Sequence, residues 1–308
     1  MKVLKIIGII ILVITALIIL LWIIGSRKQS VPKNYTETVQ TGGNIEAKYI
    51  QNGKYETAYY EEGALQGFGK YEIYYPKELE SSNKKYPVVV FVNGSGIKGS
   101  TYRYLFEHLA SWGFITIGTE EENDWNGFAS EMCIRHLYKL NDNSKYNDKD
   151  NIFYNKIDFD NTGITGHSQG GVGVFNAITE QQHSNVFKVA VALSPTNKEL
   201  AHNIEWDYDA SKISIPIMLL SGAGGGDDWV VTGEQLSDIY NDITNNKVMM
   251  RRKDTPHGEM LYSADGYVTA WFMYHLQNDQ EAGKAFIGEK AELLNNKLYQ
   301  DVRINIDE

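Results

Sequence analysis

The segment Gly166-His167-Ser168-Gln169-Gly170 contains residue types that could perform nucleophilic catalysis. It fits the pattern G-x-S-x-G, in which a serine lies on a tight turn between a strand and a helix. Small and β-branched residues, TGIT, precede it, and a helix-like run, GVGVFNAIT, follows it. Glycine is needed on both sides because a Cβ there would collide with the neighbouring strand or helix. We therefore predict that Ser168 is a nucleophile; the alternative is a plain turn in which it only caps a helix.

A serine hydroxyl needs a base to accept its proton and a carboxylate to orient that base. On a turn of this kind the partners follow the serine in the order acid, then histidine. His257 comes directly after the last predicted strand and is the expected base. The acid should follow the strand IPIMLLSG, where the chain reads SGAGGGDDWVV. We favour Asp228, because the apolar Val230 two positions later would pack inward, and keep Asp227 as the alternative. His202, in a long loop after a strand, is a minor rival for the base. The remaining histidines are not expected to serve as the base: His108, His136, His167, His183 and His275.

Acyl transfer places negative charge on a carbonyl oxygen, which backbone N–H groups can stabilise. The N–H of Gln169 lies at the start of the predicted helix, where the helix dipole adds to this effect. A second donor is expected from the loop NGSG that follows the strand YPVVVFV. We choose the N–H of Ser95 and expect Asn93 to brace the loop.

Two tryptophans, Trp125 and Trp229, follow predicted strands, at the edge of the sheet where this type of fold has its active site. We expect them to line an ester pocket, with packing or exposed positions as the alternative. The single cysteine, Cys133, excludes an internal disulfide, and its helical spacing indicates packing. The sequence contains no metal-binding motif, phosphate loop or dinucleotide fingerprint, so we expect neither metal nor cofactor.

Strands that alternate with helices must position these residues. Continuous apolar runs such as YPVVVFV are typical of strands buried on both faces. Helical spacing recurs in TYRYLFEHLASWG, GFASEMCIRHLYKL and YVTAWFMYHLQ. This alternation predicts an α/β fold with a mostly parallel central sheet and helices on both faces. KYETAYYEE and GKYEIYYP, separated by a glycine-bearing turn, predict an antiparallel pair at the sheet edge.

The N-terminal region has a different composition. Residues 6–24, IIGIIILVITALIILLWII, carry no charge and are long enough to cross a bilayer as a helix. We predict a transmembrane anchor in residues 1–25, with a cleaved signal segment as the alternative. Residues 26–45 would form a polar tether, residues 46–288 the catalytic domain and residues 289–308 a helical or polar C-terminal tail. The protein would cross the cell membrane once, with the catalytic domain on the extracytoplasmic side.

The charge distribution disfavours one class of partner. The formal net charge is −10, although residues 1–28 contain only basic charges. A predominantly acidic domain lacks the clustered lysine and arginine that bind nucleic acid. The sequence therefore indicates no nucleic-acid partner, and it points to no obligate protein partner.

Several of these segments resemble the α/β-hydrolase superfamily over residues 46–288. VVVFVNGSG, YRYLFEHLASWGF, DFDNTGITGHSQGG and YVTAWFMYHLQ are similar to its dienelactone hydrolase, cutinase and polyester-hydrolase branch. The resemblance implies an α/β-hydrolase fold and a serine esterase without a cofactor. It maps the nucleophile to Ser168, the base to His257 and the acid to Asp228 or Asp227, with oxyanion donors at the positions chosen above.

The expected function is a serine-dependent carboxylic ester hydrolase that acts on a small-molecule or lipid-like ester. Water and other acceptors compete for the same acyl-enzyme, so an acyltransferase or a peptidase with the same triad is the alternative within enzymes. A catalytically silent binding module displayed at the surface is the alternative from another class, because a fold does not guarantee a function.

Overall fold

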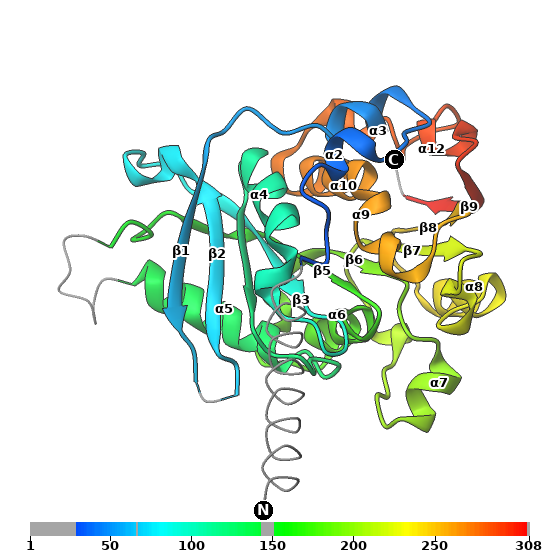
Figure 1. The fold of residues 1–308 in the computed structure, drawn as a ribbon, viewed down its shortest axis with the longest axis horizontal. Coiled ribbons are helices and arrows are strands. Elements are labelled where there is room, and N and C mark those ends of the chain that lie inside the picture. The colour runs from blue at the N-terminus through cyan, green and yellow to red at the C-terminus, as the bar shows by residue number, and fades with distance from the viewer. Residues whose placement is uncertain (1–28, 66, 143–150, 307–308) are drawn as a thin grey trace, which may run out of the picture.

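The computed structural model describes residues 29–65, 67–142 and 151–306 (Figure 1). Its strands are β1 (Thr57–Gly63), β2 (Lys70–Pro76), β3 (Tyr86–Val92), β4 (Ile115–Thr119), β5 (Ile157–His167), β6 (Phe187–Leu193), β7 (Ile217–Ala223), β8 (Lys247–Lys253) and β9 (Tyr299–Asn305). They form one sheet in the order β1-β2-β4-β3-β5-β6-β7-β8-β9. Neighbouring strands from β4 to β8 in this order are parallel, whereas β1, β2 and β9 pair antiparallel with their neighbours.

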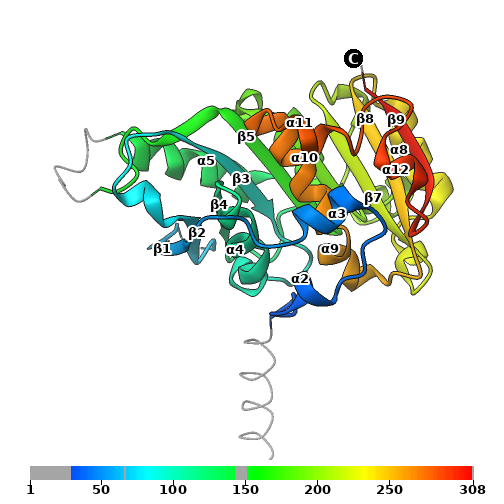
Figure 2. The same ribbon diagram turned by 90° about the horizontal axis from the view of Figure 1, so that it is seen from above.

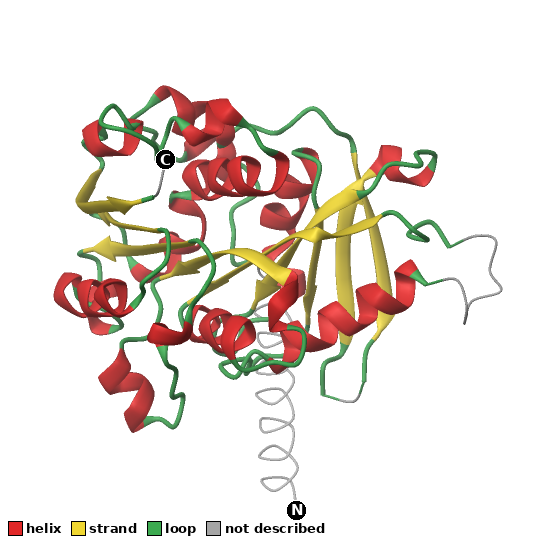
Figure 3. Ribbon diagram, turned by 180° about the vertical axis from the view of Figure 1, so that it is seen from behind, coloured by secondary structure: helices red, strands yellow, loops and turns green. Residues whose placement is uncertain are grey.

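The helices cover both faces of this sheet (Figure 3). They are α2 (Tyr35–Thr38), α3 (Asn44–Tyr49), α4 (Arg103–Ser111), α5 (Phe128–Asn141), α6 (Gln169–Thr179), α7 (Lys198–Asn203), α8 (Gly233–Asp242), α9 (Met260–Ser263), α10 (Asp265–Gln277), α11 (Gln280–Gly283) and α12 (Glu292–Asn295). One hydrophobic core lies between the sheet and α5, α6 and α8, and a second lies between the sheet and α4 and α10.

Strand β3 shows why the sequence folds in this way. Val88 and Val90 belong to the core beneath α5 and α6, whereas Val89 and Phe91 belong to the core beneath α4 and α10. Successive side chains of a strand point to opposite faces, so an uninterrupted apolar run fills both cores. The predicted α/β fold, with a mostly parallel sheet and helices on both faces, is confirmed. The predicted antiparallel pair at the sheet edge is β1 with β2.

The prediction of a polar tether over residues 26–45 differs from the structure. Residues 29–45, the part that the structure describes, pack against the domain. Val31 and Tyr35 are buried, and the Tyr35 hydroxyl donates a hydrogen bond of 2.7 Å to Asp265 Oδ2. Nearby, the buried Glu46 accepts hydrogen bonds from the Tyr299 hydroxyl at 2.6 Å and from Arg252 Nη1 at 3.1 Å. These partners are more than 200 residues away, so the polar composition of the segment conceals its packing.

The C-terminal prediction also needs correction. Residues 299–305 form the edge strand β9, which pairs antiparallel with β8, so the sheet extends beyond the predicted boundary at residue 288. Val302 and Ile304 alternate with exposed residues and pack against the core beneath α10. This period of two is the usual pattern of a strand with one buried face.

No helix in the described ranges is long and apolar enough to cross a membrane. The predicted anchor, residues 6–24, lies outside those ranges and is not described by the structure.

Candidate active site

Ser168 occupies the turn between β5, which ends at His167, and α6, which begins at Gln169. Its φ of 60° and ψ of −122° are unusual for a residue with a side chain, and such strain is often found at functional sites. A Cβ on Gly166 would lie 2.3 Å from the carbonyl oxygen of Gly170, so a side chain cannot be accommodated there. The predicted strand–turn–helix is thus present, and two glycines allow it to form.

His257 lies in the segment that follows β8. Its Nδ1 lies 2.5 Å from Oδ1 of Asp227, which is completely buried. The other carboxylate oxygen of Asp227 accepts a hydrogen bond of 2.9 Å from the Ser194 hydroxyl and another from the N–H of Gly222. A buried carboxylate is stable only when it is paired or hydrogen-bonded. These three donors therefore satisfy the buried side chain of Asp227 and fix its orientation toward the imidazole.

We favoured Asp228 as the acid, but the carboxylate that contacts His257 belongs to Asp227. Asp228 is half-exposed, and its carboxylate pairs with Nη2 of Arg251 on β8. Gly224, Gly225 and Gly226 all have positive φ, at 102°, 63° and 93°, and lead into a short 3-10 helix at residues 227–229. This turn directs the first aspartate inward and the second outward. The inward apolar residue that follows is accordingly Val231, which is completely buried, rather than Val230.

His167, which is not expected to serve as the base, lies against His257. Its Nε2 is 2.8 Å from the carbonyl oxygen of His257, and the two rings are 4.4 Å apart. Burial lowers the pKa of His167 to about 3, so the ring is neutral near pH 7 and its Nε2–H donates to that carbonyl. His167 therefore holds the backbone of His257 in place.

The other histidines are held in their own contacts, away from the Asp227–His257 pair. Nδ1 of the buried His108 lies 2.7 Å from Asp265, and Nδ1 of the exposed His202 lies 2.8 Å from Asp207. His136 and His275 are in α5 and α10 as predicted, and burial lowers the pKa of each to about 4. His183 lies in a turn and contacts Glu131.

The loop predicted to stabilise the oxyanion begins beside the serine turn, because Val92 pairs with Gly166 in the sheet. Asn93 braces it as expected: its side-chain amide donates to the carbonyl oxygens of Thr119 at 2.7 Å and Glu121 at 2.8 Å. The backbone N–H groups of Ser95 and Gln169 donate to no acceptor among the described residues. Both groups are thus available to a bound oxyanion.

The side chain of Gln169 connects this turn to the loop after β4. Its Oε1 accepts a hydrogen bond of 3.0 Å from the N–H of Asp124. The carboxylate of Asp124 in turn accepts one of 2.8 Å from the N–H of Ala129 at the start of α5. Burial raises the pKa of Asp124 to about 7. Sequence reasoning missed Asp124, His167 and Ser194, although Ser194 could have been found because it follows a predicted strand at the active-site edge.

The two predicted pocket residues have different surroundings. Trp125 follows β4 and is partly buried, whereas Trp229 follows β7 and is 87% exposed. The carbonyl of Trp125 accepts a hydrogen bond of 2.9 Å from Asn176 Nδ2, which fixes its backbone against α6. Both lie at the carboxyl edge of the parallel strands, and their contact with a substrate remains a prediction.

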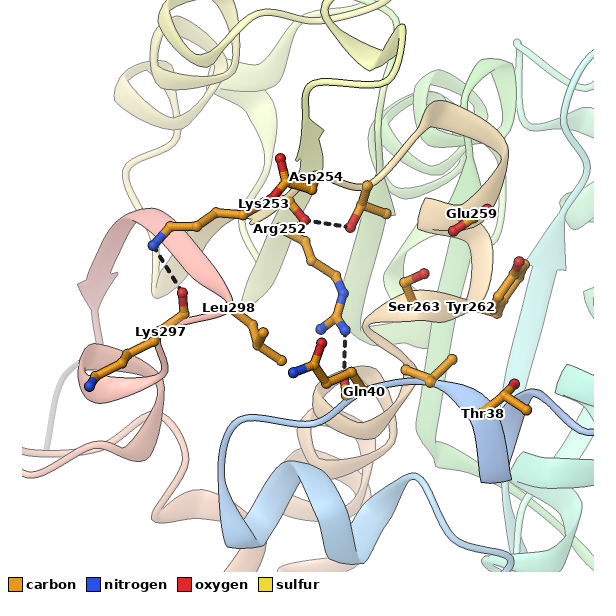
Figure 4. A pocket seen from close by; sticks show the side chains of 12 residues that line it. Thr38, Gln40, Arg252, Lys253, Asp254, Glu259, Tyr262, Ser263, Lys297 and Leu298 are labelled. Carbon is orange, nitrogen blue, oxygen red and sulfur yellow. Dashed lines mark hydrogen bonds between the residues drawn. The ribbon is translucent and has the colours of Figure 1, made fainter.

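A polar cavity of about 440 Å³ lies beside the segment that carries His257, and Figure 4 shows the side chains that line it. Its lining includes Thr255, Glu259 and Ser263, but none of Ser168, Asp227 and His257. The Arg252 side chain points toward the carbonyl of Gln40 and is paired with Glu46. The cavity is therefore separate from the catalytic groups.

Two further expectations concern cysteine and metals. Cys133 is buried, and burial raises the pKa of its thiol well above the ordinary value, as expected of a packing residue. Within residues 29–65, 67–142 and 151–306, no cluster of three or more His, Cys, Asp or Glu side chains could hold a metal ion.

Comparison with known proteins relates this chain to two hydrolases. Chlorophyllase-1 of Arabidopsis thaliana is 26% identical over 209 residues, which cover 57% of this chain and 59% of the relative. The bis(hydroxyethyl) terephthalate hydrolase of Streptomyces coelicolor is 27% identical over 165 residues, which cover 52% of this chain and 46% of the relative. The chain thus spans about half the length of these relatives. The model of the PET hydrolase-like family matches residues 34–300, most of the chain, and the protein belongs to this family.

Proposed function

We propose that the protein is a serine-dependent carboxylic ester hydrolase. The observation that carries this proposal is the buried Asp227, hydrogen-bonded to His257 and placed with it at the edge of the sheet where Ser168 occupies its strained turn. Membership of the PET hydrolase-like family supports it, as does similarity to the Streptomyces relative, a bis(hydroxyethyl) terephthalate hydrolase.

In the proposed mechanism, Ser168 attacks the ester carbonyl while His257 accepts the hydroxyl proton. Asp227 holds the imidazole in the tautomer that carries hydrogen on Nδ1, and His257 later protonates the leaving alcohol. The N–H groups of Ser95 and Gln169 stabilise the oxyanion. Water then hydrolyses the acyl-enzyme by the same steps. The Ser168 hydroxyl makes no hydrogen bond to another described residue here; such contacts often form only when substrate binds.

The substrate is proposed to be an uncharged small-molecule or lipid-like ester. Trp125 and Trp229 would supply aromatic surface beside the acyl or alcohol group. We also propose that residues 6–24 anchor the protein in the cell membrane by one crossing, with the catalytic domain on the extracytoplasmic side. Protease treatment of intact cells tests that location, because a cytoplasmic domain would be protected.

The test uses the full chain in detergent, with p-nitrophenyl esters of graded acyl length and a fluorophosphonate label. Ser168→Ala should abolish both hydrolysis and labelling. Asp227→Asn should lower kcat by about 10²- to 10⁴-fold, because the imidazole loses its orienting carboxylate. Asp228→Asn is the matched control. Its half-exposed ion pair contributes no more than about 1 kcal/mol, so activity should stay within about threefold.

Two results would overturn the mechanism. One is a Ser168→Ala variant that hydrolyses esters at the original rate. The other is an Asp228→Asn variant as impaired as Asp227→Asn, with both still folded by circular dichroism. Added alcohols distinguish hydrolysis from acyl transfer, since a transferase would form the new ester as its main product.

A further inference from the structure

Gln29 and Ser30, where the described chain begins, lie against the connection between β3 and α4. Ser30 donates its backbone N–H to the carbonyl of Thr101 at 3.0 Å, and the hydroxyls of these two residues are 2.9 Å apart. Gln29 Nε2 donates to the carbonyl of Ser100 at 3.3 Å. Figure 2 shows the blue segment that leads to α2 beside α4. This connection begins with the proposed oxyanion loop, so the chain enters the domain near the active-site edge.

The distance from the apolar run to this point is short. Only residues 25–28 separate Ile24 from Gln29. A fully extended chain spans at most about 3.6 Å per residue, so Gln29 lies within about 18 Å of the end of the apolar run. If the proposed anchor holds that run in a membrane, a domain on so short a connection cannot turn freely away from the membrane surface.

We propose that the carboxyl edge of the sheet, with the Ser168 site, faces a phospholipid bilayer. This inference rests on the membrane anchoring proposed above and extends it: the anchor also sets the orientation of the active site. The substrate would then be an uncharged ester that partitions into the bilayer and reaches Ser168 from the lipid surface.

Exposed apolar side chains at the same edge support this orientation. Trp229 and Leu65, at 87% and 62% exposed, are the most exposed large hydrophobic residues of the described chain. Trp229 follows β7. Leu65 lies in the turn between β1 and β2, which is at this edge because Tyr71 pairs with Thr119 at the end of β4. Figure 1 shows that turn and α7 on the same, lower side of the molecule. An indole and a leucine side chain are both favoured at a membrane interface over water.

Charge at this edge limits the kind of lipid. Asp207 is exposed beyond α7, and Glu121 and Glu122 are half-exposed after β4. Anionic headgroups would repel these carboxylates. Contact of this edge with lipid is therefore expected from its apolar side chains, which fits a zwitterionic surface and an uncharged substrate.

Site-specific labelling tests the orientation. Cys133 is buried and unreactive, so cysteines introduced by Leu65→Cys, Trp229→Cys and Lys188→Cys can each be labelled alone with nitrobenzoxadiazole. Lys188 is exposed at the opposite, amino end of β6 and is the control position. The full chain is reconstituted into phosphatidylcholine vesicles that contain a headgroup spin label. The labels at residues 65 and 229 should be quenched at least threefold more than the label at residue 188.

Equal quenching at the three positions, or stronger quenching at residue 188, would overturn the orientation. Failure of the full chain to float with vesicles would overturn the anchor on which it rests. Phosphatidylserine in the vesicles should weaken quenching at residues 65 and 229 without changing flotation; stronger quenching would refute the uncharged surface. Hydrolysis of p-nitrophenyl acetate in detergent is measured separately, so loss of the esterase mechanism is distinguishable from loss of the orientation.

Discussion

Replacing Ser194 with alanine removes one of the two hydrogen bonds that hold Asp227 Oδ2. The hydroxyl is completely buried and lies 2.9 Å from that oxygen, so water cannot take its place. A hydrogen bond to a charged group contributes about 1.5–3 kcal/mol. If that stabilisation is needed when the imidazole becomes charged, kcat should fall by about 10- to 100-fold, since about 1.4 kcal/mol corresponds to tenfold. KM should change little, because Ser194 is too deeply buried to touch the substrate.

Ser194→Gly separates the hydroxyl from the backbone. Ser194 has a φ of 43°, a conformation that glycine adopts without the cost of about 1 kcal/mol imposed by a Cβ. The glycine variant should therefore be more stable than the alanine variant by about 1 kcal/mol, yet be equally slow. The assay measures kcat and KM with p-nitrophenyl acetate, together with urea unfolding of both variants.

Two outcomes would refute this reasoning about Ser194. The first is an alanine variant that keeps more than half of the original kcat. The second is a glycine variant that regains activity in proportion to its stability, which would show that the backbone strain matters and the hydroxyl does not.

Three further predictions concern residues around the same turn. Burial raises the pKa of Asp124 to about 7, so the folded state keeps a proton that the unfolded state releases near pH 4. The free energy of unfolding should therefore fall as pH rises from about 4 to 7. In urea titrations, Asp124→Asn should lack this slope, which is at most about 1.4 kcal/mol per pH unit. His167→Gln keeps a donor for the His257 carbonyl, so it should retain a higher kcat than His167→Leu. The pKa of His167 is lowered to about 3, so the original protein loses stability as pH falls from 6 to 4, and both variants should lose less. Gly166→Ala should destabilise the fold by several kcal/mol, because its Cβ would lie 2.3 Å from a carbonyl oxygen. The control is Gly258→Ala, which has open space around it and should unfold like the original protein. Thermal melts compare the two variants.

Most of the fold could be predicted because local signals agree with it. The apolar run of β3 fills both cores, and two glycines around Ser168 permit a turn that other residues could not form. His257 could be predicted from its place after the last parallel strand. In each case the information lies within a few residues of the position concerned.

The choice between Asp227 and Asp228 could not be predicted, because the two have the same chemistry and adjacent positions. It depends on the dihedral angles of three glycines and on Arg251, which comes from the neighbouring strand and pairs with Asp228. The packing of residues 29–45 was hidden for a similar reason. Tyr35 reads as part of a polar segment, but its partner Asp265 is 230 positions later.

The arrangement of the strands explains why the proposed site depends on long-range contacts. Ser168, Ser194, Asp227 and His257 follow β5, β6, β7 and β8, which are adjacent in the sheet. Strands lie about 4.8 Å apart, so the ends of β5 and β8 are separated by about 14 Å. The segment after β8 must cross this distance for His257 to reach the serine turn.

Several contacts hold that crossing in place. The N–H of Asp254 donates to the carbonyl of Ala223 at 2.9 Å, and a Cβ on Gly225 would lie 2.7 Å from Pro256. At the far side, His167 beside Ser168 binds the carbonyl of His257 itself. His257 is therefore positioned from both ends, by the glycine turn that carries Asp227 and by the residue that precedes Ser168. Substitutions in either place should lower kcat even though neither touches the substrate, because both move the same imidazole.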